Sequence, residues 1–83
     1  MDTIKVMGRA LVNFETALAQ LKGLKSISRE SWDINKDGKD INYVFMVRKG
    51  DAKQICSMHT QTNYISTYAF TTQDILAEDW FIL

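Results

Sequence analysis

A regular alternation of side chains over residues 41–59 constrains the fold more than any other feature of the sequence. Within Ile41–Arg48, alternate positions share one face of an extended chain, and the first set is Ile41, Tyr43, Phe45 and Val47. Lys49-Gly50-Asp51 then supplies residues that favour a turn, and Ala52–His59 has the pattern of a returning strand. The sequence therefore predicts a β-hairpin.

A helix is predicted before this hairpin, over about residues 13–22. The apolar residues with helical spacing are Ala10, Leu11, Phe14, Ala17, Leu18 and Leu21. Asn13 suits the N-cap, because its side chain can accept from amides of the first turn. Gly23 suits the position just past the helix end. Residues 3–11 fit either a strand or a backward extension of the helix.

Shorter elements complete the predicted fold. After Gly23 the period changes to alternation, which predicts a short strand that ends near Trp32, and Asp33–Asp40 is polar and rich in turn residues. The later elements are a strand over 64–70, a short helix over 72–77 and a closing strand over 79–83. We expect one α+β domain over residues 1–83, with an N-terminal amphipathic helix on a mainly antiparallel sheet of four to five strands.

Composition excludes several classes of function. The chain is 46% hydrophobic and 24% charged, which is typical of a globular protein. Its ten basic and ten acidic residues cancel, so no overall field attracts nucleic acid. No apolar run approaches the roughly 18 residues of a membrane span, and the N-terminus does not resemble a signal peptide. One cysteine, Cys56, precludes an internal disulfide. We expect a soluble cytoplasmic protein.

The sequence favours neither a metal site nor an active site. Asp33–Gly38 has the alternating oxygen ligands of a calcium-binding EF-hand loop, but Val44 stands where the bidentate glutamate belongs. Cys56 and His59 lie three apart, and residues so spaced point to opposite faces of a strand. We therefore expect no catalytic residues, no metal ion and no cofactor.

The end of the chain carries the first candidate site. Its last four residues are Trp80, Phe81, Ile82 and Leu83, so this segment should pack on the rest of the protein. Packing would hold Thr71, Gln73 and Asp74 at a fixed place beside an aromatic ring, as a small-molecule site requires. The alternative is an ordinary short helix that leads into a core strand.

A second candidate lies at Arg29 and Trp32. Arginine can bind phosphate through its forked guanidinium, and tryptophan offers a face on which a purine can stack. Both residues lie where the predicted strand enters a polar loop, so both can reach a rim. In the alternative reading, Trp32 caps the sheet and Arg29 pairs with Asp79 or Glu78.

Two segments together resemble a known family. Residues 14–23 read F-x-x-A-L-x-x-L-K-G and residues 27–32 read I-x-R-x-S-W, while residues 71–80 read TTQDILAEDW. This order resembles the second Thoeris anti-defence family, the Tad-two-like proteins of phages. Ser31 departs from the family's usual glycine and Asp33 from its frequent asparagine, and residues 33–68 show no comparable match.

The resemblance implies a function and a site. Members of the family are sponges that bind cyclic ADP-ribose isomers, the signals of bacterial TIR-domain sensors. We therefore expect a phage anti-defence protein that sequesters a nucleotide second messenger, either such an isomer or a cyclic dinucleotide, without catalysis. By position the implied ligand-binding residues are Arg29, Trp32, Thr71 and Asp74, with Gln73 between the last two. The alternative is a small phage protein that binds and inhibits a host protein.

We also expect a homo-oligomer, a dimer or a tetramer. A sponge needs an affinity near nanomolar, about 12 kcal/mol, and a chain this small has little room for a cavity that buries such a ligand. A cleft between symmetric subunits would provide that room. The aromatic residues also exceed what one small core hides comfortably.

Overall fold

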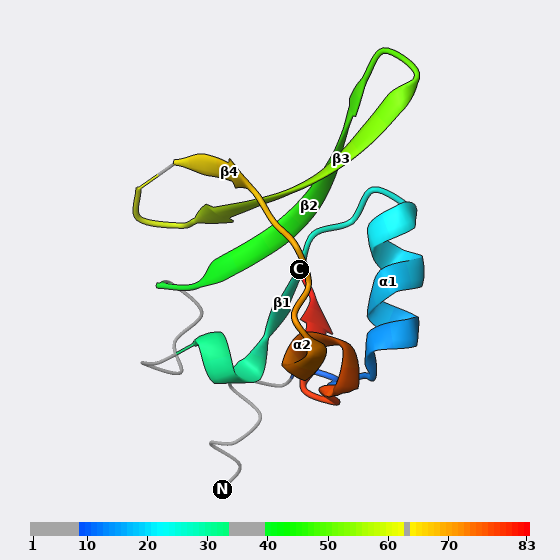
Figure 1. Cartoon of the computed structure of the whole chain (residues 1–83). Helices are drawn as coiled ribbons and strands as arrows, with labels where there is room; N and C mark the ends of the chain where they lie inside the picture. The colour runs from blue at the N-terminus through cyan, green and yellow to red at the C-terminus, as the bar shows by residue number, and fades with distance from the viewer. Residues whose placement is uncertain (1–8, 34–39, 63) are drawn as a thin grey trace, which may run out of the picture.

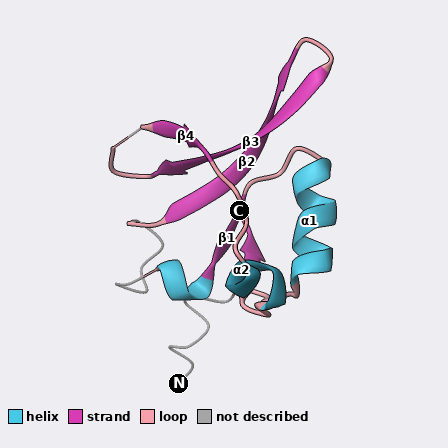
Figure 2. Ribbon diagram, viewed as in Figure 1, coloured by secondary structure: helices cyan, strands magenta, loops and turns pink. Residues whose placement is uncertain are grey.

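A computed structural model describes residues 9–33, 40–62 and 64–83 (Figures 1 and 2). The elements in chain order are helix α1 (Phe14–Lys22), strand β1 (Ile27–Arg29), 3-10 turn η2 (Glu30–Trp32), strands β2 (Asn42–Lys49), β3 (Ala52–His59) and β4 (Ile65–Thr67), helix α2 (Thr72–Leu76) and strand β5 (Trp80–Ile82). The strands form one antiparallel sheet in the order β4-β3-β2-β1-β5. The predicted α+β fold is confirmed, including the short helix before the last strand.

Helix α1 begins where the sequence predicts. The Asn13 side chain accepts a hydrogen bond of 3.0 Å from the amide of Thr16, as an N-cap residue should. Before it, Val12 forms an isolated bridge with Trp80 at the edge of the sheet. Residues 9–11, from the ambiguous segment, are in neither a helix nor a strand, and the remainder of that segment lies outside the described residues.

Helix α1 ends at Lys22 as predicted, but the residue that takes the left-handed position after it is one further along the chain than predicted. Gly23 has φ −84°, and Leu24 instead adopts the left-handed conformation with φ 70°. The amides of Leu24 and Lys25 donate to the carbonyls of Leu21 and Gln20, at 2.9 and 3.0 Å. These two bonds are those of a Schellman motif, so Leu24 occupies the position that we predicted for glycine.

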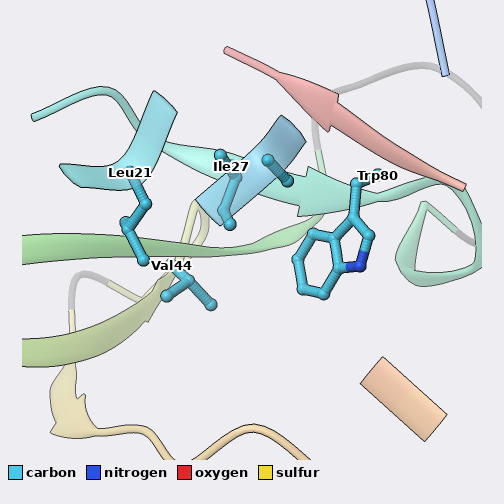
Figure 3. Close-up of a cluster of buried hydrophobic side chains, with 5 residues drawn as sticks. Leu21, Ile27, Val44 and Trp80 are labelled. Atoms are coloured by element: carbon cyan, nitrogen blue, oxygen red, sulfur yellow. The ribbon is translucent and has the colours of Figure 1, made fainter. Parts of the chain in front are cut away.

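The core lies between α1 and one face of the sheet (Figure 3). Ala17 and Leu21 of α1 pack with Ile27 of β1, Val44 of β2 and Trp80 of β5, and all five are fully buried. Ile27 is the register partner of both Val44 and Ile82, so the core spans β2, β1 and the edge strand β5. The prediction that the C-terminal segment packs on the protein is confirmed.

The predicted strand through Trp32 is shorter in the structure. β1 ends at Arg29, and Trp32 lies in the 3-10 turn η2. The turn is held to the C-terminal segment, because the amide of Glu30 donates to the Asp79 carbonyl at 2.8 Å and the amide of Ser31 donates to the Asp79 carboxylate at 3.0 Å. This anchoring bends the chain away from the sheet.

The other strands lie where the sequence predicts, and some of them are shorter than predicted. β3 has the predicted bounds and β2 is shifted by one residue, whereas β4 covers only the start of the predicted strand 64–70. The predicted turn at Asp33–Asp40 lies mostly outside the described residues. Among the residues that the structure describes, no helix is long and apolar enough to cross a membrane.

The sheet face opposite α1 also carries apolar side chains. Tyr43 pairs in register with Met58, and Phe45 pairs with Cys56. A shallow hollow of about 280 Å³ lies on the sheet, lined by Leu24, Ser26, Tyr43, Phe45, Met46 and Met58. Leu24 is 62% exposed beside it.

Candidate ligand-binding site

A cleft of about 290 Å³ lies beside Trp32, on the face of the sheet that holds the core. It is lined by Trp32, Asn42, Val44, Ser57 and Tyr68. β2 and β3 supply the middle three residues, so the sheet forms the floor and the two aromatic rings form walls. The volume is close to the lower end of the range for small-molecule sites, about 300 Å³. None of the five lining residues carries a charge.

The two aromatic walls stand edge to face. The rings of Trp32 and Tyr68 have centroids 6.0 Å apart and are inclined at 71°. Trp32 also meets Trp80 edge to face at 5.3 Å and 80°. It is half-buried and packs against the core cluster while lining the cleft. The two interpretations of Trp32, as a sheet cap and as a rim residue, therefore both describe part of its position.

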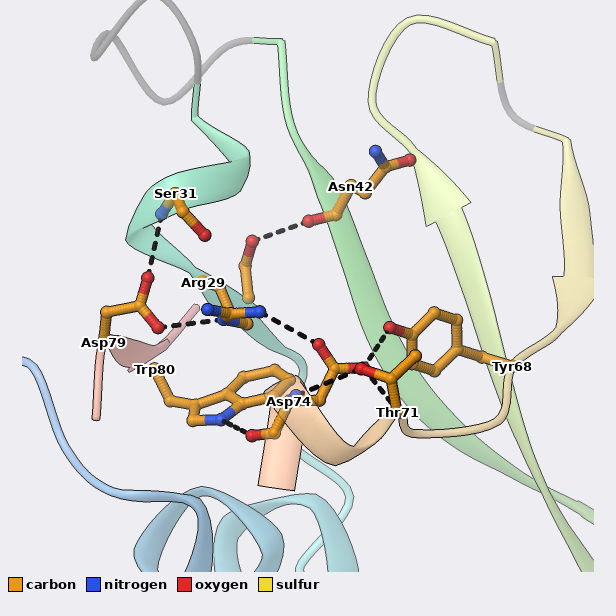
Figure 4. Close-up of polar contacts among 9 residues, drawn as sticks. Arg29, Ser31, Asn42, Tyr68, Thr71, Asp74, Asp79 and Trp80 are labelled. Carbon is orange, nitrogen blue, oxygen red and sulfur yellow. Dashed lines mark hydrogen bonds and ion pairs between the residues drawn. The ribbon is translucent and has the colours of Figure 1, made fainter. Parts of the chain in front are cut away.

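Arg29 lies between two carboxylates (Figure 4). Its Nε donates to Asp79 Oδ1 at 2.9 Å and its Nη1 donates to Asp74 Oδ1 at 3.0 Å. Burial disfavours the charge on Arg29, but its hydrogen bonds and ion pairs with Asp79 and Asp74 outweigh burial and raise its pKa. The pairing with Asp79 that the sequence left open is present, so a ligand phosphate would compete with two carboxylates for this guanidinium.

Asp74 is the buried centre of a polar network (Figure 4). Its carboxylate accepts from Arg29, from the Tyr68 hydroxyl and from the amide of Thr71. The Thr71 hydroxyl in turn accepts from the Asp74 amide at 3.1 Å, which completes a capping box at the start of α2. Burial raises the pKa of Asp74, but these hydrogen bonds outweigh it, so the pKa lies below its ordinary value.

Comparison with known families identifies the domain. The family model for the Thoeris anti-defense 2-like domain matches residues 12–83. The chain belongs to the Tad2-like family. A search of curated proteins found no match. Family membership supports a role in counteracting Thoeris defence, and the matched region contains all five residues that the sequence nominated.

The structure of this Tad2-like protein brings four of those five residues into one network. Arg29, Thr71 and Asp74 are linked by hydrogen bonds, and Arg29 lies 5.8 Å from the ring centroid of Trp32. Gln73 is exposed on α2 and takes no part in the bonds described around Asp74. Of the five, Trp32 alone lines the cleft.

Sequence reasoning missed four lining residues of the Tad2-like cleft, namely Asn42, Val44, Ser57 and Tyr68. Asn42 and Ser57 come from the central region that shows no comparable match, and Tyr68 was counted only among the aromatic residues. The alternation pattern could have pointed to Asn42, because Asn42 and Val44 share a face of the predicted strand. Ser57 is the register partner of Val44, so the hairpin pairing adds it to the same surface. Tyr68 is positioned by its hydroxyl bond to Asp74.

Metal-binding groups do not converge anywhere in the described part of this Tad2-like chain. Within residues 9–33, 40–62 and 64–83, no cluster of three or more His, Cys, Asp or Glu side chains could hold a metal ion. His59 Nε2 instead pairs with Asp40 Oδ1 at 2.7 Å. The calcium-like motif at Asp33–Gly38 lies outside the described residues except for Asp33.

The acidic network predicts a loss of stability at low pH. Burial opposes the charge of Asp79 as well, but bonds from Arg29 and the Ser31 amide lower its pKa, as bonds lower that of Asp74. A carboxyl whose pKa is lower in the folded state stabilises the fold at pH values above its unfolded pKa, which is about 3.8 to 3.9. This stabilisation is lost as the pH falls through the folded pKa. We expect the melting temperature to hold from pH 7 to about 5 and to fall below about pH 4. An unchanged melting temperature at about pH 2 would contradict this assignment.

Proposed function

We propose that this Tad2-like protein is a phage sponge that sequesters a nucleotide second messenger in the host cytoplasm, without converting it. The messenger is a cyclic ADP-ribose isomer or a cyclic dinucleotide. The observation that carries the proposal is the uncharged cleft between Trp32 and Tyr68. A purine can stack on an aromatic wall, while the Asn42 amide and the Ser57 hydroxyl offer both donors and acceptors to a base edge.

The predicted site residues take different roles in this proposal. Trp32 contacts the base, and Gln73, which is exposed on α2, is available to ribose hydroxyls. Arg29 and Asp74 act through their neighbours, because each is already engaged with charged or hydroxyl partners. Thr71 holds Asp74 in place by capping α2. None of these roles requires a reacting group, as is expected of a protein that binds a ligand without converting it.

The proposal includes assembly into a homodimer or homotetramer. The lining of the cleft carries no charge, so the phosphates of a messenger need cations from outside that lining, and a second copy can provide them. We expect light scattering at micromolar concentration to give the mass of a dimer or a tetramer. A monomeric mass would contradict the shared site.

Calorimetry tests the proposed function directly. The purified protein would be titrated with cyclic ADP-ribose, with its glycosidic isomers and with a set of cyclic dinucleotides. We expect one class to bind with Kd near nanomolar, or about 12 kcal/mol. Mass spectrometry of the ligand released on denaturation should recover it unchanged. A chemically altered ligand would indicate an enzyme, and no heat with any of these compounds would overturn the proposal.

Removal of the stacking surface should weaken binding without unfolding the protein. A base–aromatic stack contributes roughly 1–3 kcal/mol, so we expect Trp32→Ala to reduce affinity about ten- to a hundredfold. Trp32→Phe is the matched control, because it keeps an aromatic face and should lose much less. Both would be measured by calorimetry, with circular dichroism to confirm the fold. An unchanged affinity for Trp32→Ala would remove Trp32 from the site.

A second function is favoured by one observation. Ile75 and Leu76 of α2 are 49% and 73% exposed, beside a groove of about 300 Å³ that also includes the start of α1. Such an apolar surface, together with the internal pairing of Arg29 and Asp74, would suit a protein that binds and inhibits a host protein. Leu76→Glu separates the two functions. It should abolish the ability of the protein to counteract Thoeris defence if the protein acts by binding a host protein, and it should leave that ability intact if the protein acts as a sponge.

A further inference from the structure

Arg9 forms a clasp around the turn that carries Trp32. Its Nη1 donates to Glu30 Oε1 and its Nη2 donates to Asp33 Oδ2, both at 2.8 Å. Glu30 begins η2 and Asp33 directly follows it, so the two bonds bracket the turn. The guanidinium carbon also lies 3.9 Å from the ring centroid of Phe81 in β5. The clasp therefore joins the N-terminal segment, η2 and the edge of the sheet.

The clasp is largely removed from solvent. The Arg9 side chain is 14% exposed and the Asp33 side chain is fully buried. A planar guanidinium can serve two carboxylates and stack on an aromatic ring at once, whereas an ammonium group is a single point charge. The start of η2 is also bonded to Asp79, through the amides of Glu30 and Ser31. The turn is thus held by two sets of bonds, and Arg9 supplies one of them.

We propose that Arg9 is a positioning residue for the ligand cleft, which sets the orientation of Trp32 relative to Tyr68 by bonding to the residues at both ends of η2, Glu30 and Asp33. The link to ligand affinity rests on the proposed function of the cleft. Arg9 precedes Val12, where the family match begins. The proposal therefore assigns part of the site's geometry to a residue outside the matched domain.

Fluorine NMR tests the positioning without a ligand. The chain has two tryptophans, so incorporation of 5-fluorotryptophan should give two resonances, which Trp32→Phe assigns. We expect Arg9→Gln to shift or broaden the Trp32 resonance and to move the Trp80 resonance less, through its edge-to-face contact with Trp32. Arg9→Lys, which can keep one ion pair, should give a smaller change. Arg48→Gln alters an exposed arginine of β2 and should move neither signal.

The affinity of the same variants for cyclic ADP-ribose tests the consequence for the site. We expect Arg9→Gln to weaken binding roughly three- to tenfold, a part of the loss expected for a whole base–aromatic stack, with Arg9→Lys closer to wild type. If Arg9→Gln does not fold, Glu30→Gln removes only the Arg9–Glu30 ion pair, at a half-exposed position. We expect it to change the Trp32 resonance and the ligand affinity in the same direction, but by less.

Two results would overturn the proposal. One is an unmoved Trp32 resonance in Arg9→Gln, and the other is a moved resonance with wild-type affinity. If the wild-type protein binds no cyclic nucleotide at all, the proposed function fails, and the Trp32 resonance alone then decides whether Arg9 orients that side chain.

Discussion

Trp80→Ala is expected to leave most of the protein unfolded. Trp80 is fully buried, its ring lies 5.8 Å from those of Phe14 and Phe70, and its indole Nε1 donates to the Asp74 carbonyl at 2.9 Å. Loss of a buried tryptophan costs roughly 3–5 kcal/mol, which is most of the stability of a small domain near the lower end of the usual 5–15 kcal/mol. Urea unfolding followed by circular dichroism would measure the loss.

Trp32→Ala is the control for this result, because the two tryptophans touch but differ in burial. It should lose less stability than Trp80→Ala, since Trp32 is half-buried at the edge of the core. If Trp32→Ala destabilised the fold as much as Trp80→Ala and left ligand affinity unchanged, Trp32 would be a core residue and the proposed cleft would be wrong.

Asp74→Asn is expected to give the second large loss of stability. The variant keeps the shape of the side chain but removes the charge that pairs with Arg29, whose side chain is 17% exposed. The Tyr68 hydroxyl and the Thr71 amide both donate to Oδ2, whereas Arg29 donates to Oδ1, so the new amide nitrogen would face either the Arg29 guanidinium or those two donors. Breaking one partner of a buried ion pair costs about 3 kcal/mol or more. Chemical denaturation at pH 7 would measure it.

Asp40→Asn provides the matched control. Asp40 also has a side-chain partner, with Oδ1 at 2.7 Å from His59 Nε2, but the Asp40 side chain is 45% exposed. An exposed pair contributes at most about 1 kcal/mol, so this variant should remain close to wild type. A similar small effect for Asp74→Asn would show that the network contributes little to folding. Asp74→Asn should also reduce the fall in stability below about pH 4, since one of the two carboxyls responsible is gone.

The elements that the sequence predicted well are those with a clear local period. The apolar spacing and the Asn13 cap define α1, and the alternation over residues 41–59 defines β2 and β3. The helix end at Lys22 was predicted correctly, but the left-handed position after it belongs to Leu24 and not to Gly23, because leucine is not a residue that signals this conformation. The first strand was predicted too long for a different reason, since Asp79, distant in sequence, bends the chain at Glu30.

The candidate site was predictable only in part because its contacts are long-range. The motifs nominated Arg29 and Asp74, but the sequence alone did not show that these residues, 45 apart, bond to each other. That pairing changes their expected role from direct ligand contact to support of Tyr68 and Trp32. Asn42 and Ser57 were missed because their side chains become neighbours only through the register of β2 and β3.

The position of β5 in the sheet has a consequence for how the protein is made. β1 pairs on one side with β2 and on the other with β5, so Arg29 lies opposite Trp80, the first residue of the last strand. During synthesis the hairpin of β2 and β3 can form as soon as it leaves the ribosome, but the core stays open until β5 has emerged. The tryptophan-centred core therefore cannot close before β5 is available, and chains truncated before Trp80 should remain sensitive to protease.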